Sequence, residues 1–215
     1  VAFDNVGTAK NVLSIAEGGL QNISDILITM KEKVTQAASD TMGTAERDAI
    51  KNEITELVSE IDDIVSETLF NGVALIDGSY SSKSFQTGEA TTDTTSFSMT
   101  QGHTATGLSV EAANVANKVD SSTNAASALS SVNSAIDTVS DSLQSIGAMI
   151  ARLTVKESTL SVAMTNSEAT KSRILDADIA SEQLESTRLQ IIQQTATAQL
   201  AQANVTPQNV LALFT

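Results

Sequence analysis

Residues Leu129–Leu153 read LSSVNSAIDTVSDSLQSIGAMIARL, and the spacing of their apolar side chains decides the fold. Eight of these side chains follow one another at intervals of 3, 4, 3, 4, 3, 4 and 3 residues. This spacing is typical of a helix that packs along one side in a coiled coil. We therefore predict a long helix over about residues 122–166, roughly 65 Å in length. Its packing seam consists of Leu129, Val132, Ile136, Val139, Leu143, Ile146, Ile150 and Leu153.

Two earlier segments repeat the pattern and predict helices over residues 11–40 and 45–68. We expect Gly43 to end the first of these helices. Gly18 and Gly19 lie inside the first pattern, where two glycines lower helix stability and permit the close approach of a neighbour. Both helices must fold back beside the long one to bury their apolar sides, which predicts an antiparallel arrangement. Their seam residues are Leu13, Leu20, Ile23 and Leu27 in the first helix and Ile54 and Ile61 in the second.

Residues 71–120 differ in composition, because they are rich in Ser, Thr and Gly. Short β-prone pieces at residues 73–76, 84–87 and 96–99 are separated by turn signals such as Asp77-Gly78. These features predict a small antiparallel β-hairpin patch. The predicted fold class is therefore mainly α: an elongated rod of long antiparallel coiled-coil-like helices with this patch, plus a C-terminal helix.

We divide the chain into a rod domain, residues 1–170, and a C-terminal helix and tail, residues 171–215. An amide-rich helix is predicted over about residues 177–204, and Pro207 is expected to stop it. The apolar tail at residues 210–214 follows. An apolar stripe on a lone helix is unfavourable in water, so this segment requires a partner.

The composition excludes several classes of function. The chain has no Cys and a single His, which excludes thiolate chemistry and His-ligated zinc. Its net charge of −14 argues against nucleic-acid binding, and no apolar run is long enough to span a membrane. We expect His103, the pair Asp62-Asp63, and Asp176 with Asp178 to be solvated. We therefore predict no enzymatic activity, no cofactor and no metal.

Several motifs together resemble the bacterial flagellins. Residues 172–178 read SRILDAD, residues 190–194 read QIIQQ and residues 207–211 read PQNVL, which match the C-terminal signature of that family. Residues 16–20, AEGGL, resemble the family's E-G-A-L stretch near the other end. The resemblance implies a structural subunit that self-assembles into the extracellular flagellar filament for motility, after export unfolded without a cleaved secretory signal.

The resemblance also carries expectations about the extent of the chain. It begins at Val1 rather than Met and lacks the N-terminal helix that pairs with the C-terminal one in the family, so we expect a truncated or processed chain. Only about a dozen residues separate Val110 from the predicted long helix. This short connection indicates a minimal flagellin that lacks the hypervariable outer domains.

The resemblance further implies partners for particular residues. Other flagellin copies, or the flagellar secretion chaperone, are expected on the C-terminal segment. The surface read by the flagellin-sensing Toll-like receptor corresponds to Lys31, Glu32 and Glu53, but Thr29 and Lys33 replace an Arg and a Leu there, so weak recognition is expected. The residues expected in the filament core or under the chaperone are Leu189, Ile191, Ile192, Leu200, Val210, Leu211, Leu213 and Phe214.

Two alternatives from other classes remain. A hook-filament junction protein shares flagellin-like terminal helices, although the PQNVL ending favours a flagellin. A non-flagellar signalling coiled coil would have similar helical repeats, but it has no use for the hairpin patch at residues 71–120.

Overall fold

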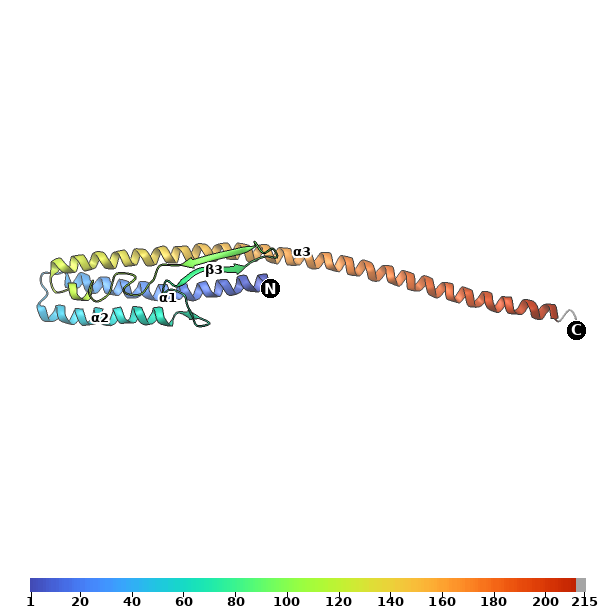
Figure 1. Cartoon of the computed structure of the whole chain (residues 1–215), viewed down its shortest axis with the longest axis horizontal. Helices are drawn as coiled ribbons and strands as arrows, with labels where there is room; N and C mark the ends of the chain where they lie inside the picture. Colours follow the sequence, from blue (N-terminus) through green and yellow to red (C-terminus); the bar gives the residue numbers. More distant parts are fainter. Residues whose placement is uncertain (212–215) are drawn as a thin grey trace. The chain divides into compact units, whose positions relative to one another are not determined.

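The computed structural model describes the backbone of residues 1–211 and the side chains of residues 1–176 and 179–204. The chain divides into two compact units, Val1–Ser161 and Val162–Thr215. In the first unit, α1 (Ala2–Ala37), α2 (Thr44–Glu67) and the first part of α3 (Ser122–Leu211) lie side by side (Figure 1). At about 1.5 Å per residue, the 36 residues of α1 span about 54 Å. The mainly α-helical fold class with long helices is confirmed.

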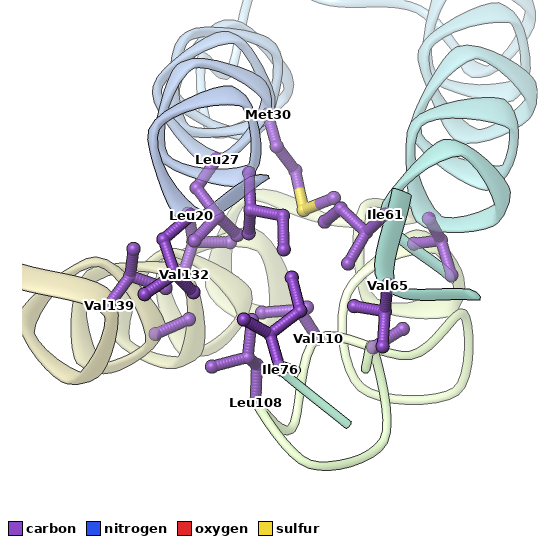
Figure 2. Close-up of a cluster of buried hydrophobic side chains, with 14 of the residues drawn as sticks. Leu20, Leu27, Met30, Ile61, Val65, Ile76, Leu108, Val110, Val132 and Val139 are labelled. Carbon is purple, nitrogen blue, oxygen red and sulfur yellow. The ribbon is translucent and has the colours of Figure 1, made fainter. Parts of the chain in front are cut away.

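One apolar core runs through the first unit. Figure 2 shows side chains from all three helices and from the connecting segments pointing toward one another. Burying each Leu, Ile or Val contributes roughly 1.5–3 kcal/mol, so the helices hold one another in place through this core. The labelled members are Leu20, Leu27, Met30, Ile61, Val65, Ile76, Leu108, Val110, Val132 and Val139.

The first helix begins well before the predicted residue 11. Val6 and Ala9 are fully buried and continue the apolar repeat of α1 toward its start. Asn5 Nδ2 donates to the Gln86 carbonyl at 3.2 Å, which ties the first turns of α1 to the end of a strand. The repeat therefore extends further than the larger apolar residues alone indicated.

The prediction that Gly43 ends the first helix is wrong. The helix α1 ends at Ala37, and Gly43 is instead the N-cap residue of α2. The Gly43 N–H donates to Glu46 Oε2 at 2.6 Å, which satisfies one exposed donor at the start of α2. The end of α1 is satisfied by a side chain from α2, because the buried guanidinium of Arg47 donates to the carbonyls of Ala37 and, at 2.8 Å, Ser39.

The antiparallel hairpin patch is confirmed, with strand limits that differ from the prediction. The strands β1 (Leu69–Phe70) and β2 (Val73–Ala74) form a minimal hairpin. Asn71 and Gly72 form its turn with φ of 50° and 77°, as a two-residue type I′ turn requires. The longer strands β3 (Tyr80–Gln86) and β4 (Thr94–Met99) pair with an irregular register between Tyr80 and Lys83, where Ser82 has a φ of 50°.

The last helix is longer than the sequence indicated. The helix α3 is continuous from Ser122 to Leu211, so the expected gap between residues 166 and 177 does not exist. The expectation that Pro207 stops the helix is also wrong. A proline removes one hydrogen bond and crowds the turn before it, yet the helix continues past Pro207 to Leu211, the last residue whose backbone is described. The tail residues Leu213 and Phe214 lie outside the described residues.

The glycine pair in α1 provides a matched test of packing. A Cβ at Gly19 would lie 2.6 Å from Thr68 Oγ1, whereas a Cβ at Gly18 would meet nothing within 4 Å. We expect Gly19→Ala to destabilise the first unit by about 1–3 kcal/mol through overpacking. Gly18→Ala should stabilise it by up to about 1 kcal/mol through helix propensity. Urea unfolding followed by circular dichroism would measure both, and equal effects of the two substitutions would contradict the close approach at Gly19.

The Arg47 contact also predicts a stability effect. Arg47→Ala leaves the carbonyls at the end of α1 without their donor, so we expect a loss of about 2–3 kcal/mol in the free energy of unfolding. Arg47→Lys should restore only part of it, because an ammonium lacks the planar fork of a guanidinium. Lys51→Ala, one turn further along α2, is the control and should change stability by less than about 0.5 kcal/mol. Equal effects of Arg47→Ala and Lys51→Ala would show that the cap contributes little.

Candidate functional site

The second unit exposes apolar side chains along α3. Leu189, Ile191, Ile192 and Leu200 are 57%, 58%, 50% and 64% exposed. At least half of the side-chain surface is also exposed at four further positions: Ile174, Leu175, Ile179 and Leu184. Large exposed apolar surface on a soluble protein marks an interaction site. We call this set the terminal stripe: Ile174, Leu175, Ile179, Leu184, Leu189, Ile191, Ile192 and Leu200. The side chains of Val210 and Leu211, which the sequence placed with these residues, lie outside the described ones.

In the first unit, the structure splits the predicted seam of α3 into two rows. One row is buried in the core: Val132, Val139, Ile146 and Leu153. The other row is only partly buried and lies at the margin of the core: Leu129, Ile136, Leu143 and Ile150. Ala125, Ala128 and Ala135 are fully buried beside the first row, so their small side chains bring α3 close to its neighbours. The seam residues of the other two helices are buried: Leu13, Leu20, Ile23, Leu27, Ile54 and Ile61.

A shallow groove lies where the marginal row of α3 meets α1. Ile28 and Ile136 give it apolar walls, and Lys31, Glu32 and Thr35 complete its lining. Ile28 is 47% exposed although it is apolar. We call this the α1–α3 groove. It combines an apolar surface with a charged rim, which is the composition of a protein–protein contact.

The three residues of the expected receptor surface do not form one cluster of free charges. Lys31 and Glu32 are exposed on α1 beside the α1–α3 groove. Glu53 lies on α2, and its carboxylate is 2.6 Å from the Lys33 ammonium, in an ion pair between α1 and α2. Lys33 stands where the receptor-binding pattern of the family has a Leu. Its ammonium therefore pairs with Glu53, the acidic residue that the pattern would offer to the receptor.

The expectation that His103 is solvated is wrong. Its side chain is fully buried, with Nδ1 at 3.1 Å from the Ile76 carbonyl and Nε2 at 2.9 Å from Ser142 Oγ on α3. Burial lowers the pKa of His103 below its usual 6.5, while the hydrogen bond with the Ile76 carbonyl opposes this shift. Sequence reasoning missed the site because Ser142 lies 39 residues away, and no local pattern marks the pairing.

The aspartate pair at residues 62 and 63 is not uniform. Asp62 Oδ1 accepts a hydrogen bond of 2.8 Å from the Ala105 N–H, so α2 anchors the loop that carries His103. Asp63 is exposed. Two aspartates elsewhere accept local hydrogen bonds that lower their pKa: the Ser79 hydrogen bonds lower the pKa of Asp77, and the Asn124 side chain lowers that of Asp120.

The described part of the chain holds neither a cluster of metal ligands nor a membrane-spanning helix. No three His, Asp or Glu side chains gather where they could hold a metal ion, as far as the described residues reach. Within the same range, no helix is both long and apolar enough to cross a lipid bilayer. A helical bundle with its own core, joined by α3 to an exposed apolar stripe, defines a structural protein that assembles through its helices.

Comparison with known proteins agrees with this class. Residues 1–81 match the family model of the bacterial flagellin N-terminal helical region, and residues 129–214 match that of the C-terminal helical region. The flagellin of Halalkalibacterium halodurans is 32% identical over 204 residues, covering 95% of this chain and 74% of that protein. The flagellin of Bacillus subtilis is 34% identical over 245 aligned residues, covering 100% of this chain and 80% of that protein.

The fold is also similar to a solved structure. The crystal structure of Bacillus cereus flagellin superposes with a TM-score of 0.62 at 23% identity, covering 73% of this chain and 88% of that one. The chain belongs to the bacterial flagellin family. It is a structural subunit of the flagellar filament, an assembly of flagellin copies.

The contact between Asp62 and Ala105 gives a test of the loop anchor. Asp62→Ala removes the acceptor of the Ala105 N–H, so we expect the free energy of unfolding to fall by about 1 kcal/mol. Asp63→Ala is the matched control, because it removes an exposed carboxylate from the neighbouring position. It should change the free energy of unfolding by less than about 0.5 kcal/mol. Chemical denaturation of both variants would measure the difference, and a larger effect at residue 63 would contradict the anchor.

Proposed function

We propose that the two units of this flagellin contact other copies in different ways. The terminal stripe forms the core of the filament by packing against the same segment of neighbouring copies. The α1–α3 groove and the marginal row of α3 form lateral contacts between the bundles. The observation that carries the proposal is the exposure of large apolar residues such as Ile192 on a helix whose described side chains form no core within the second unit.

The physical reason for polymerisation is the cost of leaving this surface in water. Removing apolar surface from water contributes about 25 cal/mol per Å², and the stripe repeats along many turns of α3. Contacts between different surfaces of successive copies continue without closing, which generates a helical filament. Glutamines at residues 190, 193 and 199 lie among the stripe residues, and their amides can hydrogen-bond with neighbouring chains.

The terminal stripe would also bind a second partner, a secretion chaperone, before the filament assembles. A secretion chaperone that covers residues such as Leu189, Ile191 and Leu200 would keep free subunits from associating, and it would compete directly with other copies. The net charge of −14 supports this order of events, because like-charged free subunits repel one another in solution. Export as an unfolded chain to an extracellular filament is compatible with the absence of cysteine, since no disulfide has to form.

For the Toll-like receptor we propose weak recognition only. Lys31 and Glu32 are exposed, but Glu53 is engaged by Lys33, and a receptor would have to break that ion pair to use the carboxylate. The family has a structural role, and we propose that the chain has no catalytic activity. The exposed stripe also favours the filament subunit over a junction protein, because a subunit that polymerises indefinitely must offer such a surface to every copy.

A charge placed in the terminal stripe tests the proposal. Ile192→Asp should leave the thermal unfolding of the first unit unchanged, because residue 192 lies in the second unit. It should abolish filament formation, because burying an unpaired carboxylate costs several kcal/mol per contact. Sedimentation and electron microscopy after seeding with filament fragments would measure polymerisation.

The matched control is Gln194→Asp, which adds the same charge at an exposed polar position of the same helix. It should still polymerise, with at most a slower rate. Normal filaments from Ile192→Asp would exclude the stripe as the core contact. Loss of filaments in both variants would mean that charge alone, and not the apolar stripe, controls assembly.

A further inference from the structure

The buried imidazole of His103 joins two parts of the first unit that are distant in sequence. The Ile76 carbonyl, just before β3, accepts from the His103 N–H at 3.0 Å and also lies 3.1 Å from Nδ1 of the same residue. On its other side, the ring reaches Ser142 on α3. The ring therefore connects the segments on both sides of the β3–β4 hairpin to the longest helix.

The hydrogen bonds around the ring can be completed with either of two proton counts. Ser142 Oγ lies 2.9 Å from Nε2 and 3.0 Å from the Thr138 carbonyl, but its hydroxyl has only one proton to donate. When the ring is neutral, Nδ1–H donates to the Ile76 carbonyl and Nε2 accepts from Ser142. When the ring is protonated, both nitrogens donate, and the Ser142 hydroxyl turns to the Thr138 carbonyl.

We propose that His103 is a proton-sensitive latch that holds the β3–β4 hairpin and the loop after it on α3, and that acid loosens this contact. Protonation costs no hydrogen bond, since both arrangements are complete. What it costs is the burial of a positive charge at a position with no exposed surface. The latch is therefore closed by a neutral ring and weakened by a charged one.

The charged groups on the surrounding elements do not offset this cost. The ring's own hydrogen-bond partners are a carbonyl and a hydroxyl. The nearest carboxylates in the sequences of the contacting elements are Asp62 on α2, Asp77 beside Ile76, and Asp141 beside Ser142. Asp62 is bonded to the Ala105 N–H and Asp77 to the Ser79 N–H, and Asp141 is exposed. Desolvation is accordingly the largest influence on the ring, and it lowers the pKa.

The direction of the pH dependence follows from this shift. Because the folded pKa lies below the unfolded value of 6.5, the unfolded chain binds a proton first as the pH falls. The contribution of the neutral ring to stability is complete above about pH 6.5 and is lost as the pH falls toward the folded pKa. Asp77 and Asp120 have pKa values lowered from 3.8, so their contributions are lost only at more acidic pH.

The chain contains natural reporters for both ends of the latch. His103 is the only histidine, so one set of imidazole NMR signals reports its titration and tautomer without any substitution. Tyr80 is the only tyrosine, and there is no tryptophan. It is buried in β3 against Phe97 of β4, with ring centroids 6.4 Å apart, so tyrosine fluorescence reports the hairpin. Helix content from circular dichroism reports the bundle separately.

The first experiment is an NMR titration of the unassembled full chain. We expect the neutral ring to be the Nδ1–H tautomer and its pKa to lie below 6.5. A pKa at or above 6.5, or an Nε2–H tautomer at neutral pH, would overturn the proposal. This measurement does not depend on filament contacts, so its outcome is separate from that of the assembly proposal.

The second experiment compares thermal unfolding of wild type and His103→Gln at about pH 7.5 and pH 5.0, on either side of an ordinary histidine pKa. We expect the tyrosine-detected Tm of the wild type to fall by at least about 3 °C more than that of the variant over this range. Parallel pH dependence in the two proteins would exclude the latch. A fall seen only in helix content, with no change at Tyr80, would also contradict it.

The Ser142 partner needs its own control. Ser142→Ala removes the hydroxyl that the ring contacts, so the tyrosine-detected Tm should fall already at neutral pH, and the imidazole signals should shift. The control is Ser145→Ala, which changes an exposed serine three residues further along α3, and it should leave both readouts unchanged. Equal behaviour of the two serine variants would show that the ring does not depend on Ser142.

Discussion

The structure depends on one constraint: three helices with the same apolar repeat must share a single core. Leaving a stripe of Leu, Ile and Val in water is unfavourable. Two of the helices alone would leave part of each stripe exposed, so the third helix is needed to bury them. The distribution of side-chain sizes then decides how the helices approach. Alanines such as Ala128 and Ala135 let α3 come close, and Gly19 does the same for α1 where Thr68 passes over it. The larger Leu129 and Ile136 are displaced to the margin, where they remain available to another molecule.

The two units use the same repeat for different purposes. In the first unit the repeat is satisfied within the chain, as the complete burial of Leu20, Ile61 and Val139 shows. In the second unit a shorter repeat returns on α3, with Leu189, Ile192 and Leu200 at helical spacing, but these side chains are exposed. Burial of apolar side chains stabilises the first unit within the chain. In the second unit the same stabilisation requires another surface that covers the terminal stripe. A single periodic sequence can in this way encode both a stable bundle and a segment for assembly.

The sequence predicted the helices and the hairpin patch because their signals are local. A repeat such as Ile54–Ile61 or a turn signal such as Asp77-Gly78 can be recognised within a few residues. Helix ends were less predictable, because Arg47 caps α1 from another helix and Gly43 serves α2 instead. On α3, the predicted seam combined two rows of apolar side chains, and only the neighbouring helices decide that the row with Val132 and Val139 is the buried one. The filament-core residues could be proposed only through family resemblance, and no periodicity could have paired His103 with Ser142.

Charge decides which face of the bundle is free to contact another copy. The outer side of α2 carries exposed Glu56, Glu60 and Asp63, at spacings that place them along one side of the helix. Two copies meeting through this side would bring like charges together, which costs energy at short range and is screened only beyond about 8–10 Å at moderate salt. The α1–α3 groove has no such excess, since Lys31 and Glu32 balance each other beside Ile28 and Ile136. The bundle should therefore present α1 and α3 to its neighbours and turn α2 to water, with the acidic side keeping free subunits apart.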